Sequence, residues 1–158
     1  RRAQASKMHV IYHNRSQRKD DAELNVKYVS FDELLATSDF VVICVTLNPS
    51  TKGLFNKEAF AKMKQGARLI NISRGPVVDS DALYDALTSG HLAWAAADVF
   101  APEPIPGDHK ILTLQNITFT PHIASATSET RDAMALLTVD NILAGLKGED
   151  LLTEVKVK

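Results

Sequence analysis

The sequence predicts an α/β fold, a doubly wound and mostly parallel sheet covered by helices. Two observations favour it. Apolar runs of strand length alternate along the chain with helix-like segments, as the connections between parallel strands require. One of these runs, residues 40–46, is almost wholly apolar, which is typical of a strand buried on both faces. The length of 158 residues allows one ordinary domain rather than two.

The individual elements follow from short apolar runs and their flanking turn residues. Strands are expected at residues 9–13, 27–29, 40–46, 68–72, 93–99 and 116–120. Helices are expected at residues 30–37, 57–64, 79–89 and 127–146, the last of them amphipathic. Ser30 and Glu33 form a capping box at the start of the first helix. Gly66 and Gly90 follow the next two helices, at positions where glycine commonly ends a helix.

Composition excludes several classes of function. The chain is 45% apolar and 23% charged, with a formal net charge of −1, so we expect neither nucleic acid nor a membrane as a partner. No apolar stretch reaches membrane-spanning length. The single cysteine, Cys44, stands in an apolar run and is expected to be a small buried hydrophobe. One cysteine cannot form an internal disulfide, which favours a reducing compartment and a cytoplasmic location.

Four polar residues come at or just after the C-terminal ends of predicted strands: Arg74, Asp98, Glu103 and His122. Ligands of open α/β sheets bind beyond these strand ends, so the four side chains can meet in one crevice. The guanidinium of Arg74 matches a carboxylate and can polarise a neighbouring carbonyl. His122 can give a proton to a carbonyl oxygen, and Glu103 on the far ring nitrogen would favour the imidazolium.

Each of these residues also has an ordinary structural explanation. Arg74 could be a surface arginine in a turn, and Glu103 a solvated carboxylate in a loop rich in proline. His122 could be a turn histidine, and Asp98 could simply terminate its strand. Their shared position, with the three chemistries that a 2-keto acid requires, favours the active-site hypothesis.

Four ordered blocks, at residues 45–53, 71–75, 98–104 and 121–127, resemble the signature blocks of the D-isomer-specific 2-hydroxyacid dehydrogenases. The likeness continues through residues 141–149 and covers essentially the whole chain. Within the family it is greatest to the glyoxylate and hydroxypyruvate reductases of animals. The resemblance implies a Rossmann-like, partial dinucleotide-binding domain at residues 1–146 and a C-terminal tail at residues 147–158.

The resemblance also implies roles for the strand-end residues. Arg74 would bind the substrate carboxylate and keto oxygen, His122 would be the general acid and base, and Glu103 would tune His122. The implied substrates are small 2-keto acids, glyoxylate or hydroxypyruvate, and the implied assembly is a homodimer of the full-length form. No metal is implied.

The same resemblance places cofactor contacts. Asp98 would contact the nicotinamide amide, and His122 would lie beside the ring. The residues lining the nicotinamide side would be Thr46, Leu47, Ser73 and Arg74. Ala124 stands where many relatives carry glycine, and we expect the added methyl group to be tolerated.

The choice of cofactor can be read from the end of the predicted second strand of such a fold. NAD-selective folds carry an acid there, which accepts from the ribose 2′-hydroxyl and repels a 2′-phosphate. In this chain that segment contains Asn14, Arg15, Ser16 and Arg18, with no acid before Asp20. We therefore expect NADP(H), with NAD(H) as the alternative. An ordinary solvated basic loop would also explain the segment.

The chain departs from the family at its beginning. None of its seven glycines are two residues apart, so the G-x-G-x-x-G loop that holds the pyrophosphate is absent. Residues 1–6 instead resemble the end of the helix that follows that loop. The first, central strand and the substrate-binding lobe are expected to be missing, which leaves sheet edges unpaired. We expect this form to be truncated at its N-terminus and impaired or inactive as an oxidoreductase.

Two other interpretations remain open at the level of sequence. The chain could be a non-catalytic dinucleotide-fold module that binds a partner or another copy of itself. It could also be an incomplete gene product with no independent role.

Overall fold

The computed structural model describes residues 1–155 and divides the chain into two compact units, Arg1–Phe119 and Thr120–Lys158. The first unit contains the strands and the second a long helix. The predicted boundary between a partial domain at residues 1–146 and a tail at residues 147–158 stays a prediction. Residues 156–158 of that tail lie outside the described residues.

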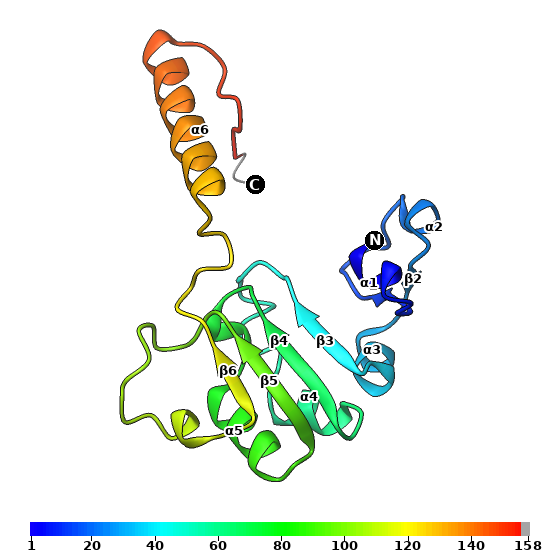
Figure 1. Ribbon diagram of the computed structural model, residues 1–158. Helices are drawn as coiled ribbons and strands as arrows, with labels where there is room; N and C mark the ends of the chain where they lie inside the picture. The colour runs from blue at the N-terminus through cyan, green and yellow to red at the C-terminus, as the bar shows by residue number, and fades with distance from the viewer. Residues whose placement is uncertain (156–158) are drawn as a thin grey trace. The chain divides into compact units, whose positions relative to one another are not determined.

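The first unit is built on a four-stranded parallel sheet in the order β3-β4-β5-β6 (Figure 1). Its strands are β3 (Phe40–Ile43), β4 (Ala67–Asn71), β5 (Leu92–Ala97) and β6 (Ile117–Phe119). One buried residue from each strand lines up across the sheet: Val41, Leu69, Ala95 and Ile117. The α/β fold and its parallel sheet, both predicted from the sequence, are confirmed.

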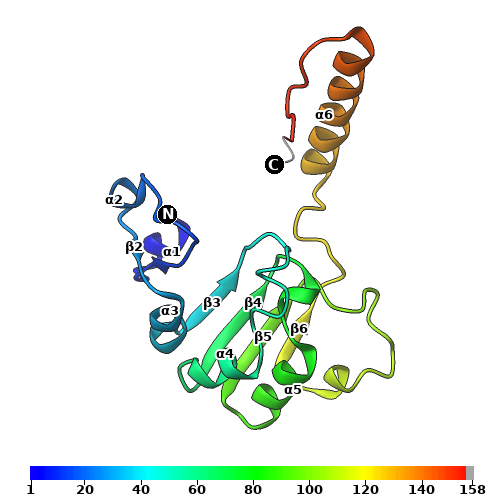
Figure 2. The same cartoon turned by 180° about the vertical axis from the view of Figure 1, so that it is seen from behind.

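Helices pack on one face of this sheet. They are α3 (Phe31–Thr37), α4 (Lys57–Lys62) and α5 (Ser80–Thr88). Figure 2 shows α4 and α5 together on that face. The side chains of Ser30, Asn56 and Asp79 cap the three helices by accepting from backbone amides of the first turn. Two short 3₁₀ helices, η1 (Gly75–Val77) and η2 (Lys110–Thr113), complete the unit. The largest fully buried side chains are Leu35, Leu69, Val77, Leu92 and Ile111.

The N-terminal segment forms a small sheet of its own. It contains α1 (Arg2–Ala5), β1 (Ile11–Tyr12), α2 (Asp21–Leu24) and β2 (Lys27–Tyr28), with β1 and β2 paired in parallel. Phe31 connects this segment to the core, because its ring contacts both His13 and Phe55 at centroid distances of 5.6 Å. The strands of the first unit thus form two separate sheets, β1-β2 and β3-β4-β5-β6.

The second face of the four-stranded sheet is not covered by the described helices of the first unit. The predicted strand 40–46 was expected to be buried on both faces, and this is wrong: Phe40 is 49% and Val42 53% exposed. The reason is that the described helices of the first unit pack against the opposite face. Cys44, which continues the same alternation, is exposed as well, so its predicted burial is also wrong.

The second unit contains α6 (Ser128–Lys147), which begins at the N-cap Thr127 and ends at Gly148. The predicted amphipathic pattern is wrong. Apolar side chains occur on several sides of α6, and Ala144 is the one buried residue of this helix. The segment after α6 is tied back by Asn141, which donates to the Thr153 hydroxyl and accepts from its amide. Within residues 1–155 no helix is both long and apolar enough to span a membrane.

Candidate active site

A hollow of about 400 Å³ lies at the carboxyl ends of β3 and β4. Its lining residues are Cys44, Val45, Thr46, Leu47, Ile72, Ser73 and Arg74. Four of them, Thr46, Leu47, Ser73 and Arg74, were predicted as site residues. The hollow forms where the segments after β3 and β4 leave the sheet. The carboxyl ends of parallel strands are where α/β proteins bind their ligands.

Asn71 shapes the turn that carries Arg74. Its side chain is only 3% exposed, and its Oδ1 accepts from the amide of Ser73 at 3.0 Å and from the Ser73 hydroxyl at 2.9 Å. Its Nδ2 donates to the carbonyl of Arg74 at 3.2 Å. The guanidinium of Arg74 donates through Nη1 to the carbonyl of Ser73 at 2.7 Å. These hydrogen bonds of the Asn71 side chain hold the turn together, which fixes where Arg74 leaves the strand.

The turn is also braced by the chain that follows β3. Backbone hydrogen bonds join Gly53 to Pro76, and join Phe55 to both Val77 and Asp79. The Thr51 hydroxyl donates to the carbonyl of Thr46 at 2.7 Å. The two sides of the hollow are therefore connected by the same loop.

Glu103 lies on a loop that passes the Arg74 turn. Gly75 is buried, and a Cβ atom on it would overlap the carbonyl carbon and oxygen of Phe100. Glu103 accepts from the backbone amide of Phe100 through Oε2 at 3.4 Å. Asp98 is 6% exposed, and its amide donates to the carbonyl of Asn71 at 3.0 Å. The turns after β4 and β5 are thus in direct backbone contact, which brings Arg74, Asp98 and Glu103 to one end of the sheet.

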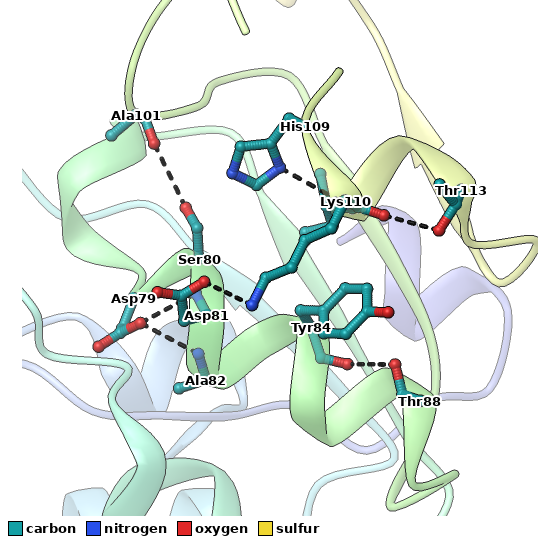
Figure 3. Close-up of polar contacts among 11 residues, drawn as sticks. Asp79, Ser80, Asp81, Ala82, Tyr84, Thr88, Ala101, His109, Lys110 and Thr113 are labelled. Carbon is teal, nitrogen blue, oxygen red and sulfur yellow. Dashed lines mark hydrogen bonds and ion pairs between the residues drawn. The ribbon is translucent and has the colours of Figure 1, made fainter. Parts of the chain in front are cut away.

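The far part of the Glu103 loop is held on α5 (Figure 3). Lys110 forms an ion pair with Asp81 at 2.7 Å and lies 4.6 Å from the ring centroid of Tyr84. The hydrogen bond from Lys110 lowers the pKa of the Asp81 carboxyl, and Asp81 in turn raises the pKa of Lys110. Nearer to Glu103, the Ser80 hydroxyl donates to the carbonyl of Ala101 at 3.4 Å.

The residues predicted to read the cofactor phosphate lie on the exposed segment after β1. Asn14, Arg15, Ser16 and Arg18 are all exposed, and none is among the residues lining the hollow. Arg18 donates to both carboxylate oxygens of Asp20, at 2.8 and 2.7 Å. This contact raises the pKa of Arg18 and lowers the pKa of Asp20. The Arg18 guanidinium therefore already faces a negative charge.

His122 and Ala124 belong to the second unit. His122 adopts a left-handed backbone conformation, with φ of 55°, and its amide donates to the carbonyl of Thr120 at 3.0 Å. Histidine is among the non-glycine residues that tolerate this region, and the conformation forms a tight turn directly after β6. Across residues 1–155 no group of three or more histidine, cysteine, aspartate or glutamate residues is placed to hold a metal ion.

A family model for the NAD binding domain of the D-isomer specific 2-hydroxyacid dehydrogenases matches residues 1–124. The chain belongs to this family. The match contains the hollow, the loop of Glu103 and His122. It confirms the predicted family and a Rossmann-type fold, and it indicates a nicotinamide dinucleotide as the cofactor.

Individual relatives support the assignment. The chain is 50% identical over 148 residues to the human "Glyoxylate reductase/hydroxypyruvate reductase", covering 93% of this chain and 45% of that protein. It is 41% identical to the solved glyoxylate reductase of Paecilomyes thermophila, with a TM-score of 0.90, covering 98% of this chain and 47% of that one. This member of the 2-hydroxyacid dehydrogenase family thus spans about half the length of the relatives it matches.

Proposed function

We propose that this chain is the cofactor-binding and catalytic part of a longer NADP-dependent reductase of small 2-keto acids such as glyoxylate and hydroxypyruvate. The main supporting observation is the hollow beside Arg74, which the buried Asn71 holds in place at the carboxyl ends of parallel strands. An arginine in that position offers two parallel donors to a carboxylate.

The proposed roles follow from the chemistry of each side chain. A bound nicotinamide cofactor supplies the hydride that reduces the keto carbon. Arg74 holds the substrate carboxylate and polarises the keto oxygen, and His122 gives that oxygen a proton. Glu103 is the proposed partner of the His122 ring, which it would orient. Because the proton and the hydride go to different atoms of one carbonyl, the product is a 2-hydroxy acid.

The residues around the hollow fit the nicotinamide end of a cofactor. Thr46, Leu47 and Ser73 would lie along the ring, Asp98 would contact its amide, and Ala124 would lie close to it with His122. The space of about 400 Å³ and the mixture of apolar and polar lining suit such a group. The sequence contains no G-x-G-x-x-G loop to hold the pyrophosphate. Binding of the whole cofactor is therefore proposed for the longer protein.

NADPH is the proposed cofactor because the segment after β1 has arginines and no acid where NAD-selective folds carry one. Arg15 and Arg18 would receive the 2′-phosphate, with Asn14 and Ser16 near the ribose. We further propose a cytoplasmic location and, from the family resemblance, a homodimeric full-length form.

The test compares the 158-residue chain with a longer chain that restores the missing half. Turnover of glyoxylate and hydroxypyruvate is measured with NADPH and with NADH. We expect activity in the longer chain and little or none in the short one, since a productive site must hold hydride donor and substrate together. Comparable rates for the two chains would contradict the dependence on the missing half.

Point variants of the longer chain test the residue roles. Arg74→Gln and His122→Asn should each lower kcat/KM by about 100-fold or more. Arg131→Gln removes an exposed arginine of α6 and should change kcat/KM by less than about twofold. If a folded longer chain binds neither cofactor, the alternative of a non-catalytic interaction module or an incomplete gene product is favoured instead.

A further inference from the structure

Two tyrosine hydroxyls hold the two ends of the segment that follows β1. The Tyr28 hydroxyl donates to the backbone carbonyl of Asn14 at 2.9 Å. The Tyr12 hydroxyl accepts from the backbone amide of Arg18 at 2.8 Å. Both distances are those of well-formed hydrogen bonds. Residues 14–18, which we call the β1 loop, are therefore tied to the small sheet at both of their ends.

The tyrosines are themselves held by the pairing of β1 with β2. Tyr12 and Tyr28 are partners in the parallel register, so their side chains leave the small sheet on the same face. Their ring centroids lie 5.4 Å apart, and the ring of His13 stacks on that of Tyr28 at a centroid distance of 6.0 Å. Rings that pack against one another keep their hydroxyls in place, as a preorganised site requires.

The carboxylate of Asp21, the first residue of α2, gives the β1 loop a third attachment. Its Oδ2 accepts from the Tyr12 hydroxyl at 3.3 Å and from Nε2 of Gln17 at 2.6 Å. The Tyr12 hydroxyl thus accepts from the loop and donates to α2, and so uses both capacities of a phenol. The loop is held at a point between its two ends as well as at the ends.

A loop held in this way is ordered before a ligand binds. A ligand that binds a mobile loop loses part of its affinity to the entropy of ordering that loop, and an ordered loop avoids the loss. Arg15 and Arg18, the residues proposed to receive the 2′-phosphate, both belong to the β1 loop. NADH has no 2′-phosphate to place on these arginines. The benefit of an ordered loop therefore applies to NADPH.

We propose that Tyr12 and Tyr28 are positioning residues that hold the β1 loop for a ribose 2′-phosphate and thereby set the preference for NADPH over NADH. This role rests on the proposed function, because it concerns the cofactor of the same site. Each tyrosine acts through the backbone of the loop, Tyr28 through a carbonyl and Tyr12 through an amide. The arginines supply the positive charge, and the tyrosines determine where that charge lies.

Tyr12→Phe and Tyr28→Phe test this role in the longer protein, because each variant loses one hydroxyl and keeps its ring. Isothermal titration with NADPH and with NADH measures the two affinities. Each variant should weaken the binding of NADPH by about 3- to 10-fold, the size of one hydrogen bond, and change the binding of NADH by less than about twofold. In turnover of glyoxylate, the KM for NADPH should rise by a similar factor and by much more than kcat falls.

Tyr84→Phe is the matched control. It removes the hydroxyl of a half-buried tyrosine on α5, whose ring contacts Lys110, and leaves the β1 loop untouched. The affinities for NADPH and for NADH should both stay as in the wild type. Any general effect of the loss of a tyrosine hydroxyl would appear in this variant as well.

Hydrogen exchange of the longer protein without cofactor reports on the β1 loop directly. In Tyr12→Phe the amide of Arg18 loses its acceptor, so the amides of the loop should exchange faster by about threefold or more. Mass spectrometry of the peptide that contains residues 14–18 follows the change. The same peptide should exchange at the wild-type rate in Tyr84→Phe.

Failure of this role can be told apart from failure of the proposed function. If the wild type prefers NADPH and both tyrosine variants keep the full preference, the role is overturned and the proposed function stands. Equal weakening of NADPH and NADH also overturns the role, because the hydroxyls would then only support the fold. Unchanged exchange of the β1 loop in Tyr12→Phe overturns it too. A wild type that does not prefer NADPH, or that binds neither cofactor, overturns the proposed function and this role together.

Discussion

Gly75 and Phe100 are in such close backbone contact that a Cβ atom at position 75 would overlap the Phe100 carbonyl. The contact joins the Arg74 turn to the loop that carries Glu103. Gly75 is not in a left-handed conformation, because it is not among the glycines with positive φ. Lack of space, and not backbone freedom, therefore explains the glycine.

The first prediction concerns this contact. Gly75→Ala should lower the free energy of unfolding by about 2 kcal/mol or more, since the overlap is with backbone that cannot rotate away. Gly107→Ala is the matched control, because a Cβ atom there meets nothing within 4 Å. Urea unfolding measures both variants. Equal midpoints for Gly75→Ala and Gly107→Ala would show that the Phe100 loop can move aside.

The second prediction concerns the Asn71 amide. Asn71→Ala should destabilise the chain by about 1–3 kcal/mol, because it removes the acceptor of the buried Ser73 amide and hydroxyl. Asn48 makes the same pair of contacts with the amide and hydroxyl of Ser50 at an exposed turn. Asn48→Ala should therefore lower the free energy of unfolding by less than Asn71→Ala does, because water can replace the lost acceptor. A cost for Asn48→Ala as large as that for Asn71→Ala, measured by urea unfolding, would contradict this account.

Comparison of the structure with the predictions from the sequence shows which features a local sequence pattern is sufficient to predict. The order of the strands and of helices α3 to α6 could be predicted because apolar runs and caps such as Ser30 are local signals. The short helix α2 was not predicted, because its polar sequence has no apolar pattern. Arg74 could be chosen because strand ends and residue chemistry are both visible in sequence. Asn71 was not chosen, although an asparagine two residues before a serine is the signal of such a turn.

The errors have a common physical cause. An apolar run such as residues 40–46 indicates that both faces of a strand prefer burial, and it contains no information on what is present to bury them. Phe40, Val42 and Cys44 are exposed because the described helices of the first unit pack on the other face. The ion pair between Arg18 and Asp20 was missed for a related reason, since neutralisation of a basic segment depends on side-chain geometry.

The third prediction concerns pH and the Lys110–Asp81 pair. The pKa of Asp81 is lowered in the folded chain, so its stabilising effect is present above the unfolded value of about 4 and is lost as the pH falls through the folded pKa. The raised pKa of Lys110 means that its effect is lost only as the pH rises through an alkaline folded value. The ion pair should therefore stabilise the folded chain at pH values between the folded pKa of Asp81 and that of Lys110.

Lys110→Met tests the pair while keeping an apolar stem over Tyr84. The urea midpoint of the variant should be below that of the wild type at neutral pH, and the difference should vanish in acid. The pKa of Asp81, followed by NMR, should rise in the variant. Lys57→Met removes a charge elsewhere on the surface and should leave the pKa of Asp81 unchanged. If acid does not diminish the difference, Lys110 acts through packing on Tyr84 alone.

The last prediction concerns cofactor choice and the neighbours of Arg18. A 2′-phosphate can use the Arg18 guanidinium only in competition with the Asp20 carboxylate, which already accepts two hydrogen bonds from it. In the longer protein, Asp20→Asn should tighten NADPH binding by about 3- to 10-fold, the size of one charge-assisted contact at an exposed site, and should leave NADH binding nearly unchanged. Arg18→Ala should weaken the binding of NADPH and leave the binding of NADH unchanged.

Glu23→Gln is the control for general charge, because it removes one acid from the same helix region without touching Arg18. Isothermal titration with NADPH and with NADH measures these affinities. If Asp20→Asn and Glu23→Gln change the affinity for NADPH equally, Arg18 does not bind the 2′-phosphate. The segment after β1 is then an ordinary basic loop.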